Sequence, residues 1–91
     1  MKIKTLLITP EMVEKILFKH GIRPSEVESV LKQRHHKTYF ENVKKERYMA
    51  IGRSLRGYIT VFFDHTAGIG EVASARFSNT SEKRKYKRKM R

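Results

Sequence analysis

The sequence contains no cysteine, and its only aspartate is Asp64. A chain without cysteine forms no disulfide and binds no metal through thiolates. Carboxylates are also too few for the acidic cluster that normally holds Mg²⁺. We therefore expect neither a metal site nor a cofactor.

Long apolar runs are missing as well. No stretch is long enough to cross a bilayer. The apolar run within residues 1–8 is too short for a secretory signal and has no small-residue cleavage site. We therefore expect a cytoplasmic protein that does not insert into a membrane.

The sequence is instead rich in positive charge. Lys and Arg number 21 and Asp and Glu 9, a formal net charge of +12 for 91 residues. This excess favours a polyanionic partner, namely nucleic acid, an acidic protein or an anionic membrane surface, over a basic surface that only confers solubility. It is most concentrated at 83–91, where seven of nine residues are Lys or Arg. We expect this segment to begin as a helix and to fray from about residue 87, because like charges repel each other.

The first third of the chain predicts a short strand at 3–8 and two helices. Thr9 can cap the first helix, and Gly21 can end it in the left-handed conformation. Ser25 and Glu28 match the capping box of the second helix. The apolar residues at helical spacing are expected in the core: Met12, Val13, Ile16 and Leu17 in the first helix, and Val27, Val30 and Leu31 in the second.

Three strands are predicted in the second half of the chain, at 46–53, 58–64 and 71–77. A glycine-bearing turn at 54–57 and a loop at 65–70 separate them. The strand at 58–64 is apolar at both alternating sets of positions, so we place it in the middle of a sheet.

A capped helix is expected after the last strand, with Asn79 as the cap and Glu82 completing a capping box. Residues 38–40 are expected to begin a further strand. Because hairpins join the strands, we expect an antiparallel sheet with the helices on one face. The predicted fold class is a small α+β domain covering 1–91, with an N-terminal helical hairpin and a C-terminal helix.

Three short motifs occur in an order and spacing that resemble one family. KHGI at 19–22 and the residues after it resemble a helical hairpin, and ERYMAIGRS at 46–54 resembles the strand E-R-x-x-x-(L/I)-G-R-(S/T). The last motif is SAR at 74–76, followed by Asn79, Glu82 and Tyr86. Together they resemble the BrnT-type toxins, a branch of the RelE-like ribonuclease superfamily of bacterial toxin–antitoxin systems. The chain departs from that pattern before its first helix, where LITPEM at 7–12 replaces an aromatic-Asp-x-x-K segment, and its basic tail is longer.

The resemblance implies a RelE-like fold and an endoribonuclease that cuts messenger RNA and blocks translation. It also implies a cognate antitoxin, usually a ribbon–helix–helix DNA-binding protein, that covers the toxin and co-represses the operon. The toxin would then contact DNA only through that complex.

Metal-independent RNA cleavage uses the 2′-hydroxyl as nucleophile and needs donors that stabilise the extra negative charge on the phosphate. Arginine is suitable because its planar guanidinium donates two bonds to a phosphate. In the predicted sheet, Arg53 and Arg76 lie on neighbouring strands, and Arg47 points to the same face as Arg53. These are the catalytic candidates. The alternative is that the arginines are solvated or form ion pairs with Glu46, Glu71 or Glu82.

Candidates for proton transfer are His65, in a predicted loop, and Tyr86, which can equally pack on the sheet or stack on a base. Histidine is a residue type suited to proton transfer, but His20 is explained more simply as a helix-end residue. His35 and His36 have no carboxylate or cysteine at ligand spacing, so we interpret them as a polar loop. The residues predicted to bind RNA are Lys83, Arg84, Lys85 and Tyr48.

Two classes of function therefore compete. One is a metal-independent endoribonuclease toxin that an antitoxin neutralises. The other is a non-catalytic basic nucleic-acid-binding module, or a degenerate toxin that only binds its antitoxin.

Overall fold

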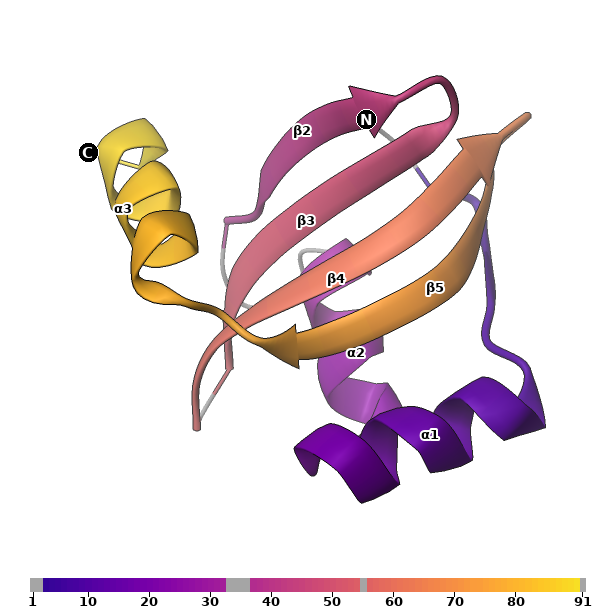
Figure 1. The fold of residues 1–91 in the computed structure, drawn as a ribbon. Coiled ribbons are helices and arrows are strands. Elements are labelled where there is room, and N and C mark those ends of the chain that lie inside the picture. The colour runs from indigo at the N-terminus through magenta and orange to yellow at the C-terminus, as the bar shows by residue number, and fades with distance from the viewer. Residues whose placement is uncertain (1–2, 33–36, 55, 91) are drawn as a thin grey trace.

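The computed structural model describes residues 3–32, 37–54 and 56–90. It is an α+β fold in which a five-stranded mixed sheet and three helices pack together (Figure 1). The elements are β1 (Thr5–Leu7), α1 (Pro10–His20), α2 (Pro24–Lys32), β2 (Tyr39–Lys44), β3 (Arg47–Ser54), β4 (Gly57–Thr66), β5 (Ile69–Phe77) and α3 (Thr80–Lys89).

The strand order is β1-β5-β4-β3-β2, so the prediction of a central strand at 58–64 is confirmed by β4. Neighbours from β2 to β5 are antiparallel, as hairpins require. The prediction of a wholly antiparallel sheet is wrong, because β1 pairs in parallel with β5. No hairpin joins these two strands, since α1 and α2 follow β1 and the chain returns at the opposite edge of the sheet.

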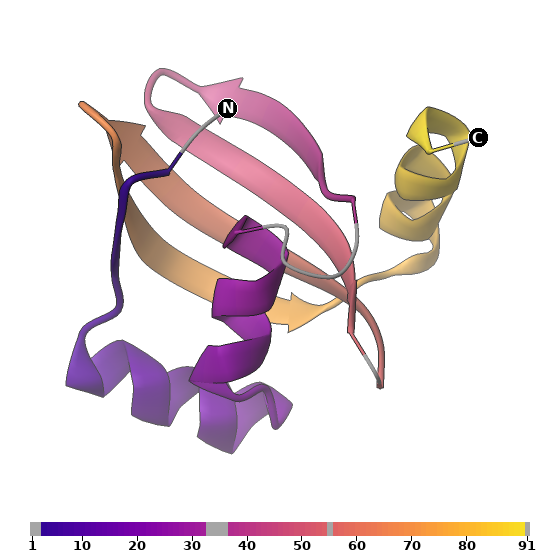
Figure 2. The ribbon, with the colours of Figure 1, turned by 180° about the vertical axis from the view of Figure 1, so that it is seen from behind.

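The helices lie on both faces of the sheet, not on one as predicted. α1 and α2 cover one face and α3 packs on the other (Figures 1 and 2). Both faces of β4 are apolar, so each needs a cover. Under α1 and α2 lies the main core, formed by Ile16, Ile22, Val27, Val30, Leu31, Ala50, Ile59, Val61, Phe63, Val72 and Ala75. A smaller cluster under α3 consists of Met49, Ile51 and Tyr86.

The predicted ends of α1 are confirmed. The Thr9 hydroxyl accepts a hydrogen bond from the Met12 N–H at 3.2 Å, and Gly21 ends the helix with φ of 66°. The prediction that Leu17 belongs to the core is wrong, because its side chain is 47% exposed. α1 packs mainly against β5, so only Ile16 of this helix is fully buried.

The predicted capping box of α2 is wrong by two residues. The helix begins at Pro24, which places Ser25 inside the first turn. The carboxylate that reaches back belongs to Glu26, which accepts the Arg23 N–H at 3.0 Å. Proline at the first helical position shifts the cap to the residue before it.

The basic C-terminal segment is more ordered than predicted. α3 is helical to Lys89, and the Met90 N–H donates to the Tyr86 carbonyl at 3.0 Å. Tyr86 and Met90 are four residues apart and both pack on the sheet, so an apolar stripe that we had not recognised holds the helix. The Asn79–Glu82 capping box is confirmed.

The strands β2, β4 and β5 extend beyond their predicted bounds, and β5 begins at Ile69 instead of residue 71. β2 extends to Lys44, and β4 extends to Thr66, so His65 lies in a strand and not in a loop. The turn after β4 is Ala67 and Gly68, both with positive φ. Leu55, within the predicted turn at 54–57, and the pair His35 and His36 lie outside the described residues.

A buried carboxylate attaches α3 to the sheet. Glu82 is 6% exposed and accepts two hydrogen bonds from the Arg76 guanidinium, at 2.7 and 2.6 Å. It also accepts the Asn79 N–H at 2.9 Å and the Thr60 hydroxyl at 3.1 Å. Burial by itself raises the pKa of Glu82, but the hydrogen bonds from Arg76, Asn79 and Thr60 outweigh it and hold the pKa below its usual range.

We expect Gly52→Ala to destabilise the protein by about 1–3 kcal/mol through overpacking. A Cβ at Gly52 would lie 3.0 and 3.1 Å from the two methyl groups of Val30, where α2 crosses β3. Urea unfolding gives the free energy. The double variant Gly52→Ala, Val30→Ala should lose less than the sum of the two single variants, because Val30→Ala removes the clash. Additive losses would show that the close approach is not the cause.

We expect Glu82→Gln to lower the free energy of unfolding by about 1–3 kcal/mol at pH 7, since a neutral amide pairs less well with Arg76. Because the folded pKa is depressed, this contribution exists above the unfolded pKa of about 4.3 and is lost as pH falls through the folded pKa. The variant should therefore differ from the original protein at pH 7 and match it more closely at pH 3. Glu14→Gln, an exposed change on α1, is the control and should follow the original protein at both pH values.

Candidate nucleic-acid interface

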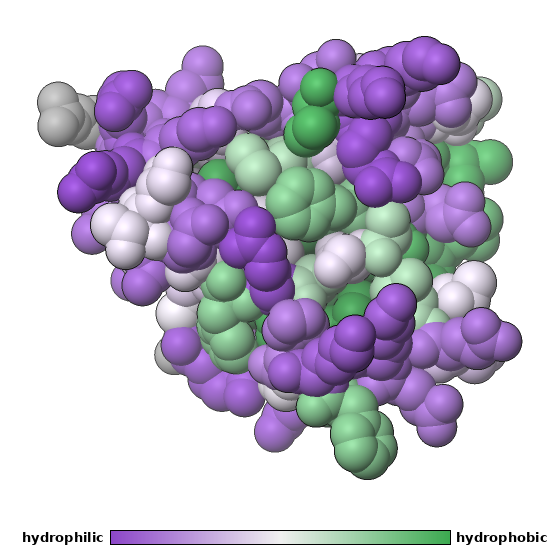
Figure 3. All heavy atoms as spheres, viewed as in Figure 1, coloured by the Kyte–Doolittle hydropathy of each residue, from purple (hydrophilic) through white to green (hydrophobic). Residues whose placement is uncertain are grey.

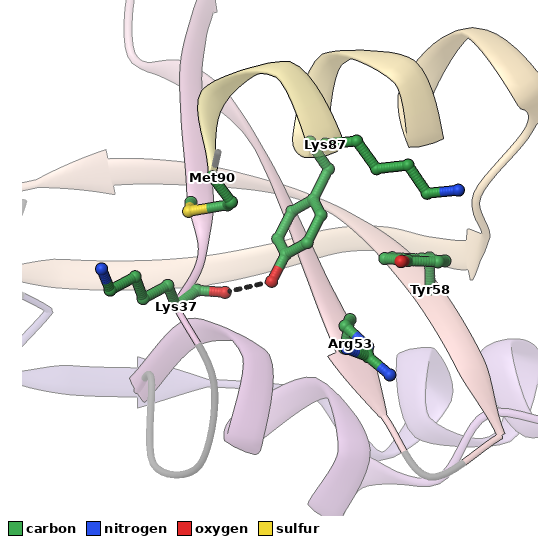
Figure 4. Close-up of a pocket in the computed structure, with 6 residues that line it drawn as sticks. Lys37, Arg53, Tyr58, Lys87 and Met90 are labelled. Atoms are coloured by element: carbon green, nitrogen blue, oxygen red, sulfur yellow. Dashed lines mark hydrogen bonds between the residues drawn. The ribbon is translucent and has the colours of Figure 1, made fainter.

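A cleft of about 440 Å³ opens between α3 and the ends of β3 and β4. Its walls come from a strand hairpin on one side and a helix on the other (Figure 4). The lining residues are Lys37, Arg53, Tyr58, Tyr86, Lys87 and Met90. Three of the six are cations, of which Arg53 and Lys87 lie at the Tyr58 ring, and none of the six is a carboxylate, so the described lining favours an anion.

Two cations flank one aromatic ring in this cleft. Arg53 Cζ is 5.7 Å from the centre of the Tyr58 ring, and Lys87 Nζ is 5.8 Å from it. Arg53 and Tyr58 face each other across the β3–β4 ladder, and Lys87 reaches the ring from α3 (Figure 4). Neither cation forms an ion pair within the described part of the chain. The cleft thus combines free positive charge with an aromatic surface, as binding sites for single-stranded nucleic acid do.

Tyr86 holds one wall of the cleft in place. It is 6% exposed, and its hydroxyl donates to the Lys37 carbonyl at 3.0 Å. Its ring packs edge-on against Tyr58 with the centres 5.3 Å apart. Burial raises the pKa of Tyr86 although Arg53 acts in the opposite direction. The hydroxyl proton is engaged in a structural hydrogen bond, and the ring packs on the sheet, which was the alternative to a role in proton transfer.

Arg76 lies outside the cleft. Its Nη1 and Nη2 atoms donate to the two carboxylate oxygens of Glu82. The guanidinium lies over the Phe62 ring, with Cζ 5.5 Å from the ring centre. The sequence had placed Arg53 and Arg76 on neighbouring strands, which is wrong, because β4 separates β3 from β5. The ion pair with Glu82 is the alternative that the sequence had left open for Arg76.

Arg47 shares a face with Arg53, as its parity predicts, but lies at the other end of β3. Its Nε and Nη2 donate to the two oxygens of Asp64, at 2.6 and 3.2 Å. These bonds lower the pKa of Asp64. Arg47 therefore belongs to a second, mixed-charge cleft, lined also by Val43, Lys44, Lys45 and Glu46.

His65 and Tyr48 meet each other and not the first cleft. The Tyr48 ring stacks on Phe63 with the centres 5.9 Å apart, and His65 contacts Tyr48 edge-on at 6.0 Å. Tyr48 also packs against the main core under α1 and α2. This ring is therefore occupied by the core, although we had predicted it to bind RNA.

The predicted RNA-binding residues of α3 divide into two groups. Lys83 and Arg84 are exposed, whereas Lys85 Nζ lies 3.3 Å from a carboxylate oxygen of Glu41 on β2. His20 is exposed in the last turn of α1, where the helix-end role fits it.

Tyr58, Lys87 and Lys37 were missed by the sequence reasoning. The signal for Tyr58 was the hairpin itself, because pairing Ser54 with Gly57 sets Arg53 opposite Tyr58. No signal pointed to Lys37 or Lys87, which reach the cleft through the packing of α3. In Figure 4 the ammonium of Lys37 points away from Tyr58, so its carbonyl is what contacts Tyr86.

The uncovered part of the same sheet face is less polar than its border. In Figure 3 pale green and white side chains occupy the centre of the view, and hydrophilic ones surround them, including most of the region of α3.

Within residues 3–32, 37–54 and 56–90, no three histidine or carboxylate side chains come together to hold a metal ion. No helix in these ranges has the length and apolar character needed to cross a bilayer.

Comparison of the sequence with models of protein families gives no match. Comparison with curated proteins gives no match either.

Proposed function

We propose that this protein is a ribonuclease toxin of the RelE-like, BrnT-type class, and that it binds and cleaves RNA in the cleft between α3 and the β3–β4 hairpin. The observation that carries the proposal is the pair of cations, Arg53 and Lys87, on either side of Tyr58 in a cleft whose described lining residues include no carboxylate. The order of the three sequence motifs that resemble this family also supports it.

The proposed reaction is a transesterification within RNA. The 2′-oxygen attacks the adjacent phosphorus while its proton is removed, and the bond from phosphorus to the 5′-oxygen breaks as that oxygen gains a proton. The products are a 2′,3′-cyclic phosphate and a 5′-hydroxyl. Arg53 and Lys87 would donate hydrogen bonds to the non-bridging oxygens, whose negative charge increases in the transition state.

The two tyrosines would position the nucleotide. Tyr58 is half-buried and presents its ring to the cleft. A base could stack on this ring and displace part of the contact that Arg53 makes with it. Tyr86 supports this ring from the side of α3. Holding an unpaired nucleotide beside Arg53 is itself a contribution to rate, because positioning lowers the entropic part of the barrier.

A non-catalytic nucleic-acid-binding module is the second candidate, and one observation favours it. Among the described residues that line the cleft there is no imidazole and no carboxylate, and the Tyr86 hydroxyl is already bonded to the Lys37 carbonyl. Such a cleft has donors for a phosphate but no evident side chain to accept the 2′-hydroxyl proton. The cleavage experiment below separates the two candidates.

We expect Arg53→Ala to lower the cleavage rate by about 10²–10³-fold, because it removes a donor that acts in the transition state. The measurement is cleavage of a labelled single-stranded RNA by purified, antitoxin-free protein in EDTA. Arg53→Lys keeps the charge and should retain more activity. Arg47→Ala is the control, since Arg47 is bound to Asp64 away from the cleft.

Several outcomes would contradict this mechanism. Activity that is lost in EDTA and restored by Mg²⁺ would exclude the metal-independent reaction. Full activity of folded Arg53→Ala would remove this residue from the site. Tight RNA binding without any cleavage would favour the non-catalytic module.

We also propose a cognate antitoxin as the protein partner, of the ribbon–helix–helix type that the resemblance implies. The basic surface suits a partner with acidic segments, because complementary charges steer association. We expect the two proteins to co-purify when expressed together at low salt, and the complex to weaken as salt screens exposed charges. Failure to co-purify with the product of an adjacent small gene at low salt would refute the partnership.

A further inference from the structure

The side of α3 that faces solvent carries positive charge that nothing in the cleft uses. Lys83, Arg84, Arg88 and Lys89 are exposed, and none forms an ion pair within the described part of the chain. The other two cations of the helix are engaged, Lys85 with Glu41 and Lys87 at the cleft.

This surface offers cations and no surface on which a base can stack. The apolar side chains of α3, Tyr86 and Met90, pack on the sheet, and its one carboxylate, Glu82, is buried in the network with Arg76. From residue 83 to residue 89 the helix rises by about 9 Å, so its four exposed cations lie within two turns, with Arg84 and Arg88 opposite the sheet and Lys83 and Lys89 on the two flanks. An array of this kind can contact phosphates but cannot hold unstacked bases.

We propose that the solvent-facing side of α3 binds the phosphate backbone of a base-paired RNA segment, next to the unpaired nucleotide held in the cleft. A duplex carries one negative charge per about 1.7 Å of its axis, a density that suits several cations within two turns of one helix. Single strands depend more on aromatic stacking, which the cleft supplies and the outer side of α3 does not. The proposal deepens the proposed function, because it assumes that RNA is the ligand of the cleft.

The outer side of α3 and the cleft should therefore have different effects on binding and on rate. Contacts to backbone phosphates add affinity uniformly and make it depend on salt, while the cleft acts on the transition state. Loss of the outer cations should therefore weaken binding and leave the rate at saturating RNA nearly unchanged. Lys87 is left out of this group, because it lies at both surfaces.

The test compares binding of two RNAs, a stem with an unpaired overhang and the same overhang alone. The RNAs carry 2′-deoxy nucleotides at the unpaired positions, so binding is measured without cleavage. The variant is Lys83→Gln, Arg84→Gln, Arg88→Gln, Lys89→Gln. The matched control removes the same charge from other exposed sites: Lys15→Gln, Lys19→Gln, Arg23→Gln, Lys44→Gln.

For the stem RNA, we expect the α3 variant to bind about tenfold or more weakly at low salt. Its slope of log affinity against log salt should be smaller by about 3. The control variant should change both values much less, and the overhang alone should bind both variants similarly. Circular dichroism confirms that each variant is folded.

Equal losses in the α3 variant and the control would overturn the proposal, since net charge alone would explain them. Equal losses for the stem and the overhang would also overturn it, because the surface would then bind single strands. An α3 variant that binds both RNAs normally but no longer binds the acidic partner protein would assign the surface to that partner instead. The binding result does not depend on cleavage, so a protein that never cleaves RNA would refute the proposed enzyme while leaving this inference standing.

Discussion

The buried carboxylate of Glu82 fixes the position of α3, and the cleft depends on that position. Removing a carboxylate from water is costly unless cations and donors surround it. Arg76, Thr60 and the Asn79 N–H supply these partners from β5, β4 and the helix cap. One turn further along, the helix then places Tyr86 and Lys87 beside Tyr58. A bond network with no part in the cleft therefore determines which residues meet there.

The sequence predicted the same role for Arg53 and Arg76, and this network explains why we propose it for Arg53 alone. The Arg76 guanidinium donates through two of its nitrogens to one carboxylate and has little capacity left for a phosphate, whereas Arg53 lies over an aromatic ring and forms no ion pair with a described residue. The motif that contains Arg76, Asn79 and Glu82 is then explained by structure: strand, cap and ion pair together attach the last helix. Gly52, in the second motif, is likewise explained by the close approach of Val30.

Local chemistry explains most of what the sequence predicted correctly. The caps at Thr9 and Asn79 and the central strand β4 depend on residues within a few positions of one another. The parallel pairing of β1 and the placement of helices on both faces depend on how distant segments pack, and no local pattern carries that information. The site likewise combines one residue that could be found from local sequence with others that depend on long-range packing. Arg53 was a candidate from its motif, but Tyr58 and Lys87 join it only through the hairpin register and the docking of α3.

The distribution of ion pairs separates structural arginines from available ones. Three carboxylates each bind one arginine, in the pairs Arg47–Asp64, Arg56–Glu26 and Arg76–Glu82. Four described arginines form no ion pair with a described residue. Arg53, Arg84 and Arg88 lie on the α3 side of the molecule, and Arg23 lies between α1 and α2. Concentrating unpaired cations destabilises a folded chain by mutual repulsion, and solubility alone is served better by interspersed charges. The three unpaired arginines on the α3 side therefore support the proposal that a polyanion binds there.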